Sequence, residues 1–282
     1  MRPFIALIGR LILTALGFLI VFAMLYPVIV AVLSSLVRAQ VIVSSPEEVA
    51  KYGLSLDHYI KAVEDPRFLA ALANSTLVAL LNIAVSVAVI TPAAYAFSRF
   101  NFRGRDLTLM VYLILSQIGG GFGVAALIAL YVFLIRLNMV GLPVIGNPFV
   151  LPIVYTAGAV PFQTWMIKNY FDSLPKSLDE SALIDGASWF DVVFKVILPA
   201  SRPAMIITAL FAFMGAWGEF IMANFLRVNT LAAYIYETAT AQVTYWSDFA
   251  ARVILFAIPI ILVYAFSQRY IGEAMRYGAG RI

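Results

Sequence analysis

The chain has 282 residues, of which 63% are hydrophobic and only 12% charged, and it contains no cysteine. About a quarter of the residues of a soluble globular domain are charged, so a chain this apolar needs lipid or neighbouring helices to cover it. The net charge of +4 suggests no nucleic-acid partner, because no basic run or zinc-type spacing accompanies it, and the missing cysteines exclude disulfides and thiol chemistry.

Uncharged stretches mark the predicted membrane spans. A helix needs roughly 20 mostly apolar residues to cross a bilayer. The N-terminal stretch starts with basic residues and is too long for the core of a signal peptide, so we expect it to remain as the first span. Glycines and prolines before Phe149 place the start of the fourth helix there. The six predicted spans are 11–37, 68–98, 107–135, 149–167, 204–225 and 249–266.

Six spans put both termini on the same side of the membrane. That side carries the larger share of the 19 lysines and arginines, and such residues collect in the cytoplasm. The sequence therefore predicts an all-α, polytopic transmembrane helical bundle in the plasma or inner membrane, in contact with membrane lipid. Residues 1–282 would form a single domain with both termini in the cytoplasm.

The third predicted span contains a run of glycines. Gln117 precedes Gly119, Gly120 and Gly121. Clustered glycines can break or bend a membrane helix, and loosened backbone is tolerated only where it is buried in protein or lines a cavity. Two interpretations stay open: these residues form a wall or hinge of a translocation path, or they allow helices to pack closely.

Residues 168–202 connect the fourth and fifth spans and carry more structural signals than a simple connector. Ser177 and Glu180 have the S-x-x-E spacing of a capping box, which predicts a short helix from Ser177 to about Asp185. Gly186 suits the left-handed position that ends such a helix.

A second short helix is expected after this glycine. Ser188 can cap it, aromatic and aliphatic residues follow, and Pro199 ends it. Two short helices joined at a glycine would make a rigid projection suited to a groove on another protein. The alternative is a solvated amphipathic loop whose acidic residues only keep it soluble.

Two further ionisable residues need an interpretation. Glu219 lies near the outer end of the fifth span, where it is either functional or simply reaches interfacial water. The only histidine, His58, falls in the first outer loop beside Asp57, where we expect a solvated side chain and no metal site.

Residues 180–187 (ESALIDGA) and 196–199 (VILP) resemble the EAA loop of ABC-importer permeases. That motif reads E-A-A, three residues, G, nine residues and I-x-L-P. The spacing is kept, while Ser181 and Val196 depart from it. Residues 95–104 (YAFSRFNFRG) are similar to the carbohydrate branch of this family, and the closest likeness is to the six-helix subunit of maltose-type permeases.

The resemblance implies a permease subunit of an ATP-driven importer, for a sugar or related polyol. It implies a heterodimer with a homologous permease, two ATP-binding subunits and an extracytoplasmic solute-binding protein. The chain has no G-x-x-x-x-G-K-[ST] phosphate loop, so it is expected to be no enzyme and to bind no cofactor, with ATP and Mg on the partner ATPase. The implied ATPase contacts are Glu180, Ser181, Ala182, Asp185, Gly186, Ala187, Leu198 and Pro199. The residues expected on the translocation path are Gln117, Gly119, Gly120, Gly121 and Glu219.

The main alternative is a secondary transporter driven by an ion gradient. It would need ionisable residues at mid-bilayer and inverted repeats around broken helices. The deep parts of the predicted spans are uncharged, which favours the ATP-driven importer.

Overall fold

The computed structural model describes residues 2–43, 45–118 and 123–279. Every regular element in these residues is a helix, apart from one isolated bridge between Val37 and Leu54. This composition confirms the all-α class. The residues Gly119, Gly120 and Gly121 lie outside the described part of the chain, between α5 (Arg105–Ile118) and α6 (Gly123–Met139).

Four described helices contain apolar segments long enough to cross a membrane, and a fifth candidate is a bent pair. The bent pair joins residues 189–200 to α11 (Arg202–Gly218) at an angle of 87°. The four are α1 (Arg2–Leu36), α4 (Pro66–Arg99), α7 (Val150–Ser173) and α14 (Trp246–Ala279). The other helices are α2 (Pro46–Tyr52), α3 (Asp57–Glu64), α8 (Ser177–Ile184), α9 (Trp189–Asp191), the π-helix η1 (Val192–Ile197), α10 (Leu198–Ala200), α12 (Ile221–Phe225) and α13 (Leu231–Ala239).

The fifth predicted helix is divided in the structure. It ends at Gly218, and the chain becomes extended at Glu219 before α12 begins. The Glu219 carboxylate accepts hydrogen bonds from the backbone N–H groups of Met222 (2.8 Å) and Ala223 (3.3 Å). A carboxylate in this position satisfies N–H groups that have no partner inside the helix, which explains the break in an otherwise apolar segment.

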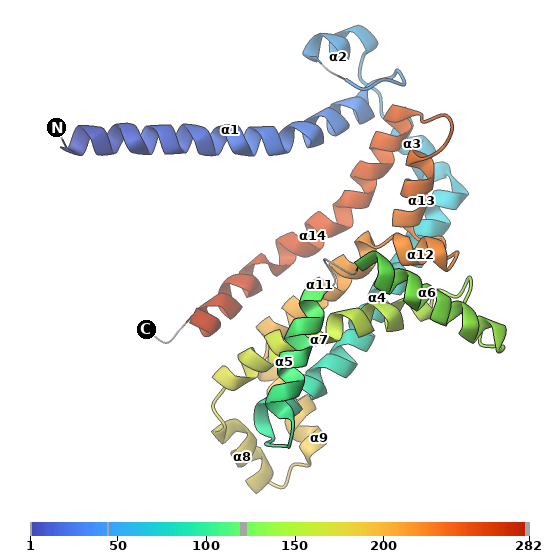
Figure 1. The fold of residues 1–282 in the computed structure, drawn as a ribbon. Coiled ribbons are helices and arrows are strands. Elements are labelled where there is room, and N and C mark those ends of the chain that lie inside the picture. The colour runs from blue at the N-terminus through green and yellow to red at the C-terminus, as the bar shows by residue number, and fades with distance from the viewer. Residues whose placement is uncertain (1, 44, 119–122, 280–282) are drawn as a thin grey trace. The chain divides into compact units, whose positions relative to one another are not determined.

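Residue contacts divide the chain into two compact units, which we describe separately. The first comprises residues 1–69 and 235–258, and the second comprises residues 70–234 and 259–282. In the second unit α7 packs against both α5 and α11 (Figure 1). The hydrophobic core there draws buried residues from α4, α7, η1 and α11, namely Ile90, Ala94, Tyr95, Ile167, Phe171, Val192, Val193, Ile197 and Ala204.

A buried polar junction joins α4, α7 and α11 within the second unit. The Asn82 amide donates to the carbonyl oxygen of Ala212 (2.7 Å) and accepts from the Thr156 hydroxyl (3.0 Å). The Ser86 hydroxyl lies 3.0 Å from that of Thr156. Because lipid offers no polar partners, these side chains satisfy one another across the helices.

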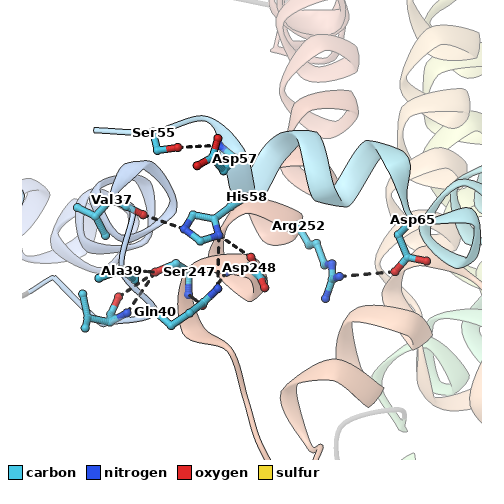
Figure 2. A network of polar contacts seen from close by, with 11 residues as sticks. Val37, Ala39, Gln40, Ser55, Asp57, His58, Asp65, Ser247, Asp248 and Arg252 are labelled. Carbon is cyan, nitrogen blue, oxygen red and sulfur yellow. Dashed lines mark hydrogen bonds and ion pairs between the residues drawn. The ribbon is translucent and has the colours of Figure 1, made fainter. Parts of the chain in front are cut away.

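The first unit contains a network around His58, and the expectation of a solvated histidine is wrong (Figure 2). His58 is only 3% exposed. Its Nδ1 lies 2.5 Å from Oδ1 of Asp248, and its Nε2 lies 2.8 Å from the carbonyl oxygen of Val37. Nε2 therefore faces a carbonyl oxygen, while Nδ1 faces a carboxylate oxygen and has Nε2 of Gln40 3.5 Å away. Beside them Ser247 donates to the carbonyl oxygen of Ala39 (2.7 Å), so the network ties the start of α14 to the chain after α1.

Candidate functional site

The first short helix of the 168–202 segment forms, but without the predicted capping box. Lys176 is the N-cap residue, has helical backbone angles and makes no side-chain cap. A capping side chain requires extended backbone at the cap, and Ser177 already lies inside the helix. Ser181 instead donates to the carbonyl oxygen of Ser177 (2.7 Å), one turn back along the helix.

The turn at Gly186 forms as predicted. Gly186 has φ of +86°, in the left-handed region, and the N–H of Ala187 reaches back to the carbonyl oxygen of Ala182 (3.0 Å). This bond closes the helix in the manner of a Schellman turn. A Cβ at Gly186 would meet nothing within 4 Å, so the requirement for glycine is conformational and not spatial.

The second short helix starts with the predicted cap at Ser188. Its hydroxyl accepts from the N–H of Asp191 (3.2 Å), and the Asp191 carboxylate accepts from the N–H of Ser188 (3.3 Å). The hydrogen bond with Lys195 and those with Ser188 lower the pKa of Asp191 to about 2, so this cap keeps its charge at any working pH. The helical course continues through η1 and ends at Ala200, one residue beyond the predicted Pro199.

A buried carboxylate anchors the segment, and sequence reasoning missed it. Asp179 is 6% exposed. Its Oδ1 accepts from the Tyr95 hydroxyl (2.8 Å), and its Oδ2 lies 2.8 Å from Nε of Arg99. Arg99 also donates to the carbonyl oxygen of Leu174 (3.3 Å). We call Tyr95, Arg99 and Asp179 the anchor triad.

A second set of polar contacts connects α4 to the end of α7. The Ser98 hydroxyl donates to Asp172 (2.7 Å), whose other oxygen lies 2.5 Å from Nζ of Lys168. Tyr95 and Arg99 lie one helical turn apart, so they share a face of α4. The last turn of α4 therefore holds both α8 and the end of α7. Figure 1 shows α8 and α9 at this end of the second unit.

The outer face of the segment combines acidic and apolar side chains. Ile184 is 85% exposed and Phe190 is 69% exposed. A rigid surface with exposed apolar groups and an acidic rim is typical of a protein contact site. Of the predicted docking residues, Glu180, Ser181, Asp185, Gly186 and Pro199 are exposed, whereas Ala182, Ala187 and Leu198 are partly buried.

The residues expected on a translocation path are only partly described. Gln117 lies in α5, and the three glycines lie outside the described residues. Glu219 is half-buried, and besides capping α12 it accepts a hydrogen bond from the Tyr155 hydroxyl (2.6 Å). Both carboxylate oxygens are therefore already engaged. Within the described residues, no group of three or more His, Asp and Glu side chains is placed to hold a metal ion.

Among the described residues of this segment no set of groups is suited to bond breaking, and the exposed surface of the two short helices rests on the anchor triad. Comparisons with known proteins identify the family. The chain is 29% identical to the maltodextrin transport system permease protein MalD of Streptococcus pneumoniae over 265 residues, covering 91% of this chain and 90% of the relative. It is 32% identical to the maltose/maltodextrin transport system permease protein MalG of Salmonella typhimurium over 285 residues, covering 95% of each chain.

A solved structure supports the fold. One chain of a bacterial ABC transporter involved in the import of the acidic polysaccharide alginate matches with a TM-score of 0.73 at 21% identity, covering 93% of this chain and 96% of that chain. The family model for the binding-protein-dependent transport system inner membrane component matches residues 3–277. Because this match spans nearly the whole sequence, the chain belongs to the family of inner membrane components of binding-protein-dependent transport systems.

Proposed function

We propose that this chain is the permease subunit through which an ABC importer moves a sugar or related polyol, and that residues 168–202 dock on the ATPase. The relatives named for maltodextrin and maltose transport support the sugar class. ATPase activity in such importers lies on a separate subunit, so the chain is no enzyme. Nothing in these comparisons supports the alternative of an ion-driven secondary transporter.

The proposed membrane arrangement is one permease domain with six spans and both termini in the cytoplasm. α1, α4, α7 and α14 would each supply one span. α5 and α6 together would supply another, and α11 the remaining one. This arrangement puts residues 168–202 in the cytoplasm, where an ATPase can reach them.

The proposed assembly is a heterodimer of two homologous permeases with two ATP-binding subunits, which hold ATP and Mg, and an extracytoplasmic solute-binding protein. Partners of the last kind are supported by a solved alginate ABC transporter in complex with a periplasmic protein, whose chain matches with a TM-score of 0.60. In alternating access, closure of the ATPases would move the docked segment and open the pore toward the outside.

One observation carries the proposal: the EAA-like segment is folded as two short helices around a left-handed glycine, and the buried anchor triad holds its base. A coupling element must be stiff, because a flexible loop would absorb the movement of its partner. The docking contacts would come from Glu180 and the exposed residues around it, with Ser181, Asp185, Gly186 and Pro199. The partly buried Ala182, Ala187 and Leu198 would support them from beneath.

The test measures solute uptake and ATP hydrolysis together, using the complete transporter in proteoliposomes. Glu180→Lys reverses a charge on the docking surface, and Gly186→Pro imposes a φ near −65° where +86° is needed. We expect each change to reduce uptake per ATP at least tenfold while the chain still inserts in the membrane. Gly186→Asn is the matched control, because asparagine tolerates the left-handed region. Full uptake in both Glu180→Lys and Gly186→Pro would refute the docking role.

A further inference from the structure

The second unit contains a cavity of about 300 Å³ between α6, α7 and α11. This volume is at the lower end of the range for small-molecule sites, so it suits one small ring or a short polyol. The walls are mostly apolar, and glycine and alanine residues bring the helix backbones close to the space. The lining residues are Asn82, Leu127, Leu130, Val154, Tyr155, Gly158, Ala159, Gln163, Phe211, Ala212, Gly215, Glu219 and Met222.

Gln163 is the polar group in this cavity that the protein leaves unsatisfied. Its side chain is on α7 and is 4% exposed, and its Oε1 is buried without a hydrogen-bond partner among the described residues. Buried polar atoms in folded proteins nearly always have a partner, and the exceptions call for a functional explanation or a bound molecule. An amide that lines a cavity in this state is placed to accept a hydrogen bond from a ligand hydroxyl.

The other polar lining groups are already engaged. Asn82 uses its amide at the junction with Thr156 and Ala212. Tyr155 donates to Glu219, and both oxygens of Glu219 accept from the protein. Gln163 thus provides the polar specificity, and Phe211 provides an aromatic surface against which the C–H face of a ring can pack.

The charge of the lining excludes one class of ligand. Glu219 is its only carboxylic acid, and the lining includes no lysine, arginine or histidine. A phosphate or carboxylate entering this low-dielectric space would meet a carboxylate and no compensating cation, which is strongly unfavourable. A neutral hydroxyl-rich molecule meets no such penalty.

We propose that this cavity is a solute-binding site on the chain itself, taking one unit of a neutral polyhydroxylated solute with Gln163 as the hydrogen-bond acceptor. The inference rests on the proposed function and makes it more specific, because it separates neutral sugars and polyols from acidic sugars and sugar phosphates.

The first experiment changes Gln163 to Met in the complete transporter. Methionine keeps the length of the side chain and removes the amide. Uptake of radiolabelled maltose by proteoliposomes, at a concentration well below saturation, should fall about tenfold, which corresponds to the loss of one good hydrogen bond. Because the protein does not use the amide oxygen internally, thermal stability should stay equal or rise. Reduced stability with unchanged uptake would assign Gln163 a structural role and overturn the proposal.

The second experiment detects binding without transport. The chain has no native cysteine, so Gly158→Cys places a single thiol at the cavity wall, where an added Cβ would meet nothing within 4 Å. Maltose, trehalose and glycerol should each be tried as neutral probes, and at least one should slow labelling by a thiol reagent severalfold, while glucose 6-phosphate at equal concentration should not. Val243→Cys, exposed and outside the cavity, is the control and should be unprotected.

The outcomes separate the two proposals. If the wild-type transporter takes up neutral solute but Gly158→Cys is never protected and Gln163→Met transports normally, the cavity site is wrong and the proposed function stands. If the wild type takes up none of the neutral probes and glucose 6-phosphate protects the thiol, both the neutral class and the sugar import proposed above are contradicted.

Discussion

Each of the two units contains a carboxylate that ties together parts of the chain distant in sequence, but Asp179 is buried whereas Asp248 is partly buried, and the two fix different things. Asp179 pairs with Arg99 and Tyr95 of α4, and the segment that it anchors, residues 168–202, exposes acidic and apolar groups. Asp248, in the first turn of α14, pairs with Nδ1 of His58, and Nε2 of His58 lies within hydrogen-bond distance of the carbonyl oxygen of Val37, just after α1. Asp179 holds in place the segment that we propose meets a partner protein. Asp248 instead fixes the start of α14 to α3 within its own unit.

The comparison teaches that a paired carboxylate can serve coupling to a partner in one unit and stability alone in the other. If this distinction between Asp179 and Asp248 is correct, disturbing Asp179 should change uptake per ATP as well as stability. Disturbing His58 should change stability alone.

The largest effect is expected for Asp179→Ala. Removing one partner of a buried ion pair leaves Arg99 uncompensated, which lowers the free energy of unfolding by about 3–5 kcal/mol. Thermal unfolding of the purified transporter and uptake per ATP should both fall. Asp185→Ala, at an exposed position in the same segment, is the matched control and should change stability by less than about 0.5 kcal/mol. Wild-type stability in Asp179→Ala would contradict the anchor triad.

Tyr95→Phe should give a smaller effect of the same kind. It removes only the hydroxyl that donates to Asp179, and a hydrogen bond to a charged group contributes about 1.5–3 kcal/mol. The loss should appear in the same unfolding measurement, together with a partial decrease in uptake per ATP. An unchanged ratio of uptake to hydrolysis would mean that the triad holds α8 without contributing to coupling.

His58→Gln tests the other side of the comparison. It breaks the contacts with Asp248 and Val37, which should lower the free energy of unfolding by about 1–3 kcal/mol. Uptake per ATP should stay at the wild-type value in the molecules that remain folded. Asp57→Asn, next to it and exposed, should leave both quantities unchanged. A coupling defect in His58→Gln equal to that of Asp179→Ala would remove the distinction between the two carboxylates.

The smallest effect on stability is expected when the whole triad is replaced by apolar residues of similar size, Tyr95→Phe with Arg99→Met and Asp179→Leu. Replacing a complete buried ion pair often leaves stability unchanged or raised, because no uncompensated charge remains. Unfolding of this triple variant should lie near that of the wild type and well above that of Asp179→Ala. If it is as unstable as Asp179→Ala, the packing around the pair matters more than its charges.

The parts that sequence reasoning recovered depend on local chemistry. Gly186 and Ser188 were predictable because a left-handed turn and an N-cap are decided by a few adjacent residues. The capping box at Ser177 was predicted wrongly because its spacing was right but the chain enters α8 with Lys176 already helical.

The missed features depend on residues that are far apart along the chain. Asp179 lies 84 residues from Tyr95, and His58 lies 190 residues from Asp248. Sequence reading assigned His58 to solvent because its partner belongs to another part of the chain. Gln163 carried no signal in the sequence, and only its burial beside a cavity distinguishes it.

The central claim is that residues 168–202 face the cytoplasm and meet the ATPase there. The missing native cysteines allow a direct test with single-cysteine variants and a membrane-impermeant maleimide. Lys176→Cys, at an exposed position of the segment outside the proposed ATPase contacts, should react only after the membrane is opened, whereas Val243→Cys, exposed in a proposed outer loop, should react in intact cells. Labelling of Lys176→Cys in intact cells, with Val243→Cys protected, would contradict the account.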